Sequence, residues 1–313
     1  MKKLYAVMFI LLVFSMSSCS GAKQEVVFVR NEKFATIKES TFEDSVKSDD
    51  SEINLENVIV NTKEEFLKYF ENVSKSKRRK KTFVVSELFS DAIDNEEFKD
   101  FNLVILGGDN DDEINLNVDQ RHISYLFGVI SGMMTRTNSV MLIYSNELKD
   151  SYENALSFMA GGKKVNLRAF DSLYNNRNVL DLSSIEKDKM ESTLDDFVRN
   201  NNSDTIFYIS DDLSEKILSL SSELNKELFT LSEWGNNLLG GVSYDYKNIF
   251  KDVLNGNNKE SNYLVDILNK NVSINLDKLP QEVRDICESV LTEMVDGKIN
   301  FPTTLDELKG IKH

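Results

Sequence analysis

The chain has 313 residues, of which 41% are hydrophobic and 28% charged, and its formal net charge at pH 7 is −15. This composition provides buried cores for about two domains and excludes a wholly disordered chain. The acidic balance argues against a nucleic-acid partner, because phosphates require a basic surface. Two cysteines exclude a disulfide scaffold, and two histidines leave little material for metal sites or histidine-based catalysis. We therefore expect that the protein is not an enzyme and that it has no cofactor, no metal and no catalytic residues.

The N-terminus has the pattern of a secretory signal peptide over residues 1–18. Two lysines precede an apolar run at residues 4–14, whose roughly 11 residues are too few for a permanent membrane span. The sequence MSSC at 16–19 resembles a bacterial lipobox, so we expect cleavage before Cys19 and acylation of its thiol. The alternative is an ordinary signal peptide that contains a cysteine. An acylated Cys19 and a short tether (19–24) would hold the protein at a cell membrane, facing the periplasm or the outside.

Beyond the tether, short apolar runs typical of strands alternate with amphipathic helical patterns. We expect strands near residues 25–30, 57–60, 82–86, 103–107, 139–144, 204–210, 228–231, 263–268 and 272–276. We expect helices near 63–73, 122–135, 185–200, 213–224, 246–255 and 281–297. Nearly continuous apolar strands separated by helices predict parallel sheets that are covered on both faces. These nine strands are more than one compact sheet needs. The sequence therefore predicts an α/β fold with two doubly wound lobes.

Two charged segments and one cysteine stand out along this part of the chain. The basic run at 75–81 suits either an anionic lipid or polyanion surface, or a solvated connection between helix and strand. The acidic residues 109–113 follow a strand, where ligands bind in open α/β sheets, so Asp109 is a candidate ligand contact. These carboxylates would also suit calcium, but the spacing of an EF-hand is missing. Cys287 lies in an apolar helical pattern and is expected to be a buried thiol.

Four segments, in order, resemble the basic membrane protein (BMP) family, which includes purine-nucleoside receptor lipoproteins. They are FGVISGMMTRTNSVMLI at 127–143, FMAGGKKVN at 158–166, IFKDVLNG at 249–256 and the C-terminal stretches 279–284 and 296–302. The resemblance covers about residue 80 to the end. It implies the type I periplasmic-binding-protein fold, in which two Rossmann-like lobes are joined by a hinge of three crossovers and close over a ligand. The first lobe would hold residues 25–137 plus about 243–271, and the second 138–242 plus about 272–313.

The function implied by this resemblance is that of a substrate-binding lipoprotein of an ABC transporter. Such a protein would bind a small solute, such as a purine nucleoside, between its lobes and pass it to the permease subunits. Phe34 would stack on the base from the first lobe, with Phe42 as an alternative ring, unless either ring simply packs against a helix. Tyr174, with Asn175 or Asn176 as the polar contact, would face the base from the second lobe, unless these residues lie in an ordinary exposed loop. Trp234 suits either the mouth of the ligand site or packing between the lobes. The candidate ligand-binding residues are Phe34, Asp109, Tyr174, Asn175, Glu233, Trp234 and Lys270.

The ligand segments depart from the family pattern more than the scaffold segments do. The family's glycines are absent at 208–213 and 268–273, so the backbone approaches a ligand less closely there. Leu231 stands where the family has a ligand-facing aspartate. Each lost buried polar partner costs about 1–3 kcal/mol. We therefore expect either a changed specificity or a degenerate site, and in the second case a surface lipoprotein that uses the scaffold as a protein-interaction module.

Overall fold

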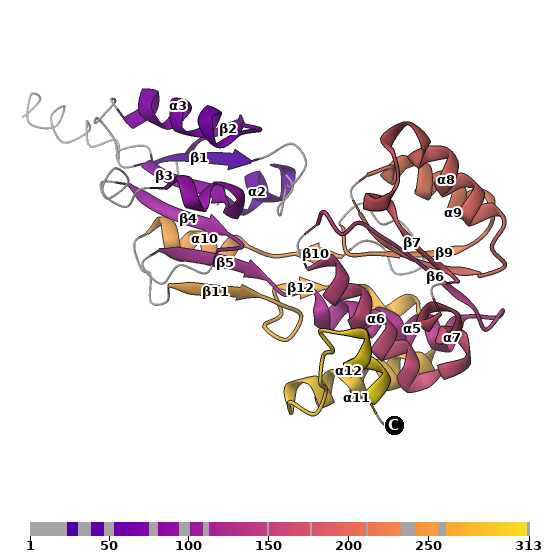
Figure 1. Ribbon diagram of the computed structural model, residues 1–313. Coiled ribbons are helices and arrows are strands. Elements are labelled where there is room, and N and C mark those ends of the chain that lie inside the picture. Colours follow the sequence, from indigo (N-terminus) through magenta and orange to yellow (C-terminus); the bar gives the residue numbers. More distant parts are fainter. Residues whose placement is uncertain are drawn as a thin grey trace, which may run out of the picture. The chain divides into compact units, whose positions relative to one another are not determined.

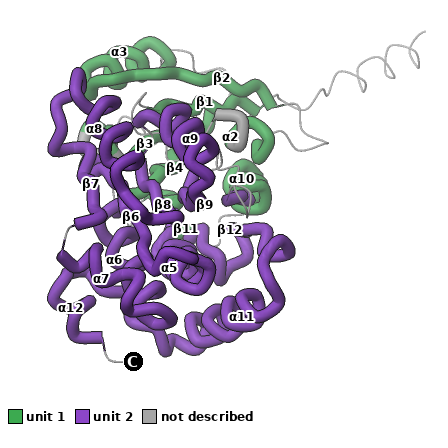
Figure 2. The backbone as a smooth tube through the Cα atoms, turned by 90° about the vertical axis from the view of Figure 1, so that its right-hand side faces the viewer, with its two compact units in different colours: residues 1–117, 246–263 green, residues 118–245, 264–313 purple. Residues whose placement is uncertain are grey.

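The computed structural model describes residues 24–30, 39–46, 53–74, 81–93, 101–108, 113–148, 150–175, 177–210, 212–232, 242–255 and 261–311 (Figure 1). The chain divides into two compact units, residues 1–117 with 246–263 and residues 118–245 with 264–313 (Figure 2). It therefore passes between the units three times. Within the described ranges, every helix is too short or too polar to cross a membrane.

The first unit is built on a six-stranded sheet with the order β11-β5-β4-β3-β1-β2. Its strands are β1 (Gln24–Arg30), β2 (Ile53–Ile59), β3 (Lys81–Ser86), β4 (Asn102–Leu106), β5 (Ile114–Val118) and β11 (Asn262–Val265). The pairs β1–β2, β1–β3, β3–β4 and β4–β5 are parallel. The helices of this unit are α2 (Glu39–Val46), α3 (Lys63–Ser74), the 3-10 helix η1 (Glu87–Ala92) and α10 (Lys247–Leu254).

The side chains of β1 alternate between two apolar layers, as the pleat of a strand requires. Val27 and Val29 belong to a buried cluster that includes Phe66 of α3. Phe28 points to the other face, where its ring stacks on Phe42 of α2 with centroids 4.1 Å apart. Phe250 of α10 meets Phe42 edge-on at 5.0 Å. Phe42, the alternative stacking ring of the sequence analysis, is fully buried and packs in this core.

The second unit holds a four-stranded parallel sheet with the order β7-β6-β8-β9. Its strands are β6 (Val140–Tyr144), β7 (Val179–Asp181), β8 (Thr205–Ile209) and β9 (Glu227–Thr230). Helices α8 (Lys187–Arg199) and α9 (Ser214–Glu223) cover one face, and α5 (Arg121–Met134), α6 (Ser151–Val165) and α7 (Leu167–Tyr174) cover the other (Figure 1). The unit is completed by η2 (Leu182–Ser184), β10 (Ser243–Tyr244), β12 (Val272–Ser273), η3 (Leu276–Lys278), α11 (Gln281–Val295) and α12 (Leu305–Gly310).

All five residues of β8 are buried, because the strand contributes to a core on each face of the sheet. Ile206 and Tyr208 belong to the apolar cluster that holds Leu194 of α8. Phe207 points the opposite way and stacks on Phe158 of α6, with ring centroids 4.3 Å apart. The continuous apolar run that predicted a strand here therefore reflects burial on both sides.

Helices α5 and α6 touch backbone to backbone through two glycines. A Cβ atom on Gly128 of α5 would lie 2.0 Å from the carbonyl oxygen of Phe158, and one on Gly161 of α6 would lie 2.0 Å from that of Tyr125. This close packing places α5 in the second unit, whereas the expected boundary at residue 137 assigned it to the first.

A half-buried carboxylate, that of Asp204, joins the turn that follows α5 to the beginning of β8. Asp204 accepts hydrogen bonds from the hydroxyls of Thr135 at 2.6 Å and Thr137 at 2.9 Å. It also accepts one from the backbone N–H of Arg136 at 2.7 Å. Burial acts to raise the pKa of Asp204, but these three hydrogen bonds outweigh it and hold the pKa below its ordinary value.

The free thiol of Cys287 is fully buried on α11, which confirms the expectation from its apolar helical pattern. Burial, with a smaller effect from the charge of Glu288, raises the pKa of Cys287 to about 12. Because the thiolate is the reactive form of cysteine, this residue is a packing group and not a nucleophile.

Candidate functional site

Most of the residues that the sequence analysis singled out lie outside the described residues. They are Cys19, Phe34, Asp109, Glu233, Trp234 and all of the basic run except its last residue, Lys81. Lys81 itself is buried and pairs with Glu25 at 3.3 Å, within the core sheet of the first unit.

Tyr174 and Asn175 lie where α7 ends, before the chain enters β7. Tyr174 is half-buried, and burial, followed by the nearby charge of Asp171, raises the pKa of its hydroxyl. Asn175 is exposed and donates its side-chain N–H to the carbonyl of Asp171 at 3.1 Å. Because both residues precede β7, they lie at the edge of the sheet where the strands begin.

Lys270 is exposed in a turn between β11 and β12, with φ at +62°. Its N–H donates to the carbonyl of Ile267 at 3.1 Å, and the N–H of Asn271 donates to that of Asp266 at 3.2 Å. Lys270 therefore adopts the left-handed conformation that glycine takes most easily.

The opposite edge of the second unit's sheet, where the strands end, carries four polar and aromatic side chains that we call the carboxyl-edge cluster: Tyr144, Asn146, Tyr152 and Asp181. The Asn146 amide donates to Oδ2 of Asp181 at 2.7 Å. Oδ1 of Asp181 accepts the hydroxyl of Ser183 at 2.6 Å. The rings of Tyr144 and Tyr152 lie 6.4 Å apart, and Tyr152 is 42% exposed.

The cluster combines the two kinds of group that a polar solute with a flat apolar face requires. Burial, and then the charge of Asp181, raises the pKa of Tyr144. A tyrosine hydroxyl can donate a hydrogen bond at neutral pH. Asn146 and Asp181 offer amide and carboxylate groups for hydroxyls, while the exposed ring of Tyr152 offers an aromatic face. Open α/β sheets bind ligands at this edge. The sequence does not reveal this cluster, because β7 has only three residues and no strand was expected there.

A second polar cluster lies near the start of α5. We call it the His122 cluster, and it consists of Asp119, His122 and Asp266, whose ligand atoms all lie within 4.8 Å of one another. Burial acts to raise the pKa of Asp119, but hydrogen bonds from Arg121 outweigh it and leave that pKa below its ordinary value. This donor set of one imidazole and two carboxylates is the one in the described chain that could hold a metal ion.

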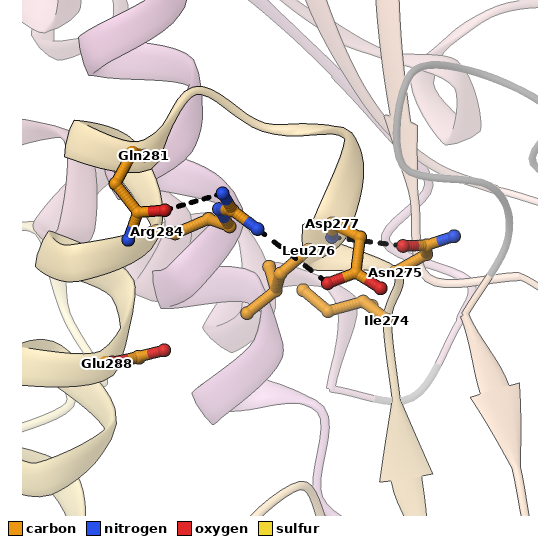
Figure 3. A pocket seen from close by; sticks show the side chains of 7 residues that line it. All are labelled: Ile274, Asn275, Leu276, Asp277, Gln281, Arg284 and Glu288. Carbon is orange, nitrogen blue, oxygen red and sulfur yellow. Dashed lines mark hydrogen bonds and ion pairs between the residues drawn. The ribbon is translucent and has the colours of Figure 1, made fainter.

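A hollow of about 500 Å³ lies at the start of α11 (Figure 3). Its polar groups are already engaged with one another. The Arg284 guanidinium donates to the Gln281 side chain at 2.6 Å and lies 3.9 Å from Asp277. We assign no ligand to it, because Arg284, Gln281 and Asp277 already contact one another. The lining residues are Ile274, Asn275, Leu276, Asp277, Gln281, Arg284 and Glu288.

Comparison with known proteins identifies the fold and not a sequence family. No protein-family model matches the chain, and no curated protein matches it significantly. A solute-binding protein of an ABC transporter system from Conexibacter woesei superimposes with a TM-score of 0.65 at 11% identity, covering 90% of this chain and 99% of its own. One from Aeropyrum pernix superimposes with a TM-score of 0.64 at 8% identity, covering 92% and 96%.

Regulators share this architecture as well. A LacI family transcriptional regulator from Enterococcus faecium with bound ribose superimposes with a TM-score of 0.53 at 14% identity, covering 80% of this chain and 96% of its own. The specific resemblance to the BMP family thus stays a prediction. The α/β expectation is confirmed, and the chain has the fold of the type I periplasmic-binding proteins.

Proposed function

We propose that the chain is the membrane-anchored solute-binding lipoprotein of an ABC-type uptake system, and that it binds a small polyhydroxylated solute such as a nucleoside. The observation that carries this proposal is the carboxyl-edge cluster, in which tyrosine rings accompany an amide and a carboxylate at the ligand-binding edge of an open sheet. A nucleoside suits these groups, because its base can stack on a ring and its ribose hydroxyls can bind Asn146 and Asp181. The solute-binding proteins of the same fold support a solute-binding role, and the regulator with bound ribose supports a polyhydroxylated ligand.

The binding claim is tested by native mass spectrometry of the purified protein, alone and with a panel of nucleosides and pentoses. We expect one solute per chain. Asp181→Asn is expected to weaken binding about tenfold, because a hydrogen bond to a charged group is worth about 1.5 kcal/mol or more. Asp188→Asn, at an exposed position of α8, is the matched control and should leave binding unchanged.

Two results would contradict this assignment. Failure of every nucleoside and pentose to bind would favour the protein-interaction module instead. Equal weakening by Asp181→Asn and Asp188→Asn would remove the carboxyl-edge cluster from the site while leaving a solute-binding function intact.

The anchoring claim makes a separate prediction for Cys19. Cys19→Ser is expected to move the protein from the membrane fraction to the soluble fraction, because the acyl chains that bind the bilayer are lost. Fractionation and intact mass of the N-terminal peptide measure this directly. Cys287→Ser is the control and should keep the acyl mass, since that thiol is buried. Unchanged membrane association of Cys19→Ser would show that the cysteine is not the anchor.

A further inference from the structure

The His122 cluster joins two segments that are far apart in the sequence. Asp119 and His122 lie just after the chain first enters the second unit, and Asp266 lies just after its last entry. The two segments run side by side, and the N–H of Asp119 donates to the carbonyl of Val265 at 2.9 Å. All three side chains of the cluster belong to the second unit.

One nitrogen in the cluster, Nδ1 of His122, lacks a hydrogen bond of suitable geometry within the described chain. Nδ1 of His122 is buried and lies 3.0 Å from Oδ2 of Asp266, close enough for an ion pair. Nevertheless, no group of the described chain makes a hydrogen bond of suitable geometry with this nitrogen. The side chains are only 14% exposed for His122 and 4% for Asp266. Buried polar atoms in native proteins nearly always have a partner, and a bound ion is one that would suit this nitrogen.

The groups around the cluster orient its donor atoms. Arg121 holds both carboxylate oxygens of Asp119, with its shortest hydrogen bond at 2.6 Å. The N–H of Leu268 donates to Oδ1 of Asp266 at 3.1 Å, which leaves Oδ2 facing the imidazole. Such partners of ligating carboxylates are a regular feature of metal sites. Oδ2 of Asp266, which Leu268 does not engage, keeps lone pairs for a metal ion.

An aromatic side chain covers the cluster. The Phe301 ring packs edge-on against the imidazole of His122 with centroids 4.6 Å apart, and the guanidinium of Arg121 lies 6.0 Å over the same ring. This cover limits access of water, which strengthens the attraction between a cation and the two carboxylates.

We propose that His122, Asp119 and Asp266 form a binding site for a divalent transition-metal ion of the Zn²⁺ type. One imidazole nitrogen and two carboxylate oxygens are donors that Zn²⁺ accepts, and three protein ligands leave its fourth position to water. Mg²⁺ and Ca²⁺ prefer oxygen alone, so the imidazole favours Zn²⁺ over them. The ion would clamp the segment before α5 to the segment after β11.

The purified protein, stripped with EDTA and then freed of chelator, is titrated with ZnCl₂ and separately with MgCl₂ by isothermal calorimetry. We expect one Zn²⁺ per chain and little binding of Mg²⁺. His122→Ala and Asp266→Asn are each expected to weaken Zn²⁺ binding roughly 100-fold. Loss of a residue that only orients a ligand costs about 10–100-fold, and loss of a ligand itself should reach the upper end of that range. His313→Ala is the matched control, because His313 is the second of only two histidines, and it should bind as the parent does.

X-ray absorption at the zinc edge of the parent protein needs no variant, so the proposal stays testable even if a substitution prevents folding. We expect one imidazole and otherwise oxygen in the first shell. Absence of Zn²⁺ binding would overturn the proposal and leave a plain His122–Asp266 ion pair. Zn²⁺ binding that survives in His122→Ala, or a first shell of oxygen alone, would overturn it too, since the ion would then bind surface carboxylates. None of these three outcomes bears on solute binding at the carboxyl-edge cluster.

Discussion

Replacing Gly161 by alanine is expected to lower the stability of the second unit strongly. The added Cβ would lie 2.0 Å from the carbonyl oxygen of Tyr125, which is backbone and cannot move aside as a side chain can. The helices α5 and α6 would have to separate, which would open the aromatic layer between α6 and β8. Overpacking of a core usually costs about 1–3 kcal/mol. Because the clash here is with backbone, we expect a loss of roughly 3 kcal/mol or more.

Chemical denaturation followed by circular dichroism measures this loss. Gly310→Ala is the matched control, because a Cβ at Gly310 at the end of α12 has nothing within 4 Å. We expect its free energy of unfolding to stay within about 0.5 kcal/mol of the parent value. Equal stability of the Gly161→Ala and Gly310→Ala proteins would show that α5 and α6 do not pack as closely as described.

Asp204→Asn is expected to lower the free energy of unfolding by about 2–3 kcal/mol at pH 7. The parent carboxylate only accepts hydrogen bonds, and it receives them from Thr135, Arg136 and Thr137. The amide nitrogen of asparagine is itself a donor, so it would face one of these donors without a bond. The side chain is only 14% exposed, which leaves little room for water to repair the loss.

The effect of the same substitution on stability should depend on pH, in a direction that the lowered pKa of Asp204 determines. The pKa of Asp204 in the folded protein lies below its value in the unfolded chain, which is about 3.9 for an ordinary aspartate. Its contribution to stability is therefore fully present above that unfolded value and is lost as the pH falls through the folded pKa. The stability difference between the parent and Asp204→Asn should shrink on acidification below about pH 4.

Melts of the two proteins between pH 3 and pH 7 test this expectation, with Asp196→Asn on the exposed side of α8 as the control. A gap in stability that does not change with pH would mean that Asp204 acts through its shape alone. A gap that widens at low pH would contradict the assigned sign.

Strands buried on both faces were the part of the fold that the sequence predicted well. The run at residues 204–210 contains β8, and that at 82–86 lies within β3, because a short uninterrupted apolar run is typical of a strand in the middle of a covered sheet. Strand β5 was missed because its sequence, INLNV, places the polar Asn115 in the sheet. There Asn115 is fully buried and donates its amide to Asn262 at 2.9 Å. A buried hydrogen bond between segments distant in sequence has no local signature.

Helix α6 was missed for a related reason. Two of its buried positions are glycines, and Ser151, Asn154 and Ser157 are also buried on it. Such residues lower helix propensity, and they suit a helix here because α5 packs closely against them. The site residues pose the same difficulty. Tyr144 and Asp181 end different strands, and His122 meets Asp266 only through the pairing of two segments that join the units.

The first unit is built from two separate stretches of the chain, residues 1–117 and 246–263, so its parts are synthesised at different times. Phe250, which closes the aromatic layer over Phe28 and Phe42, comes after the whole sheet of the second unit in the sequence. A chain delivered N-terminus first thus presents β1 and α2 with this layer uncovered until α10 arrives. Contacts that span so much sequence form slowly, and apolar surface exposed meanwhile invites aggregation. The aromatic layer of the first unit therefore closes only after the sheet of the second unit has been synthesised.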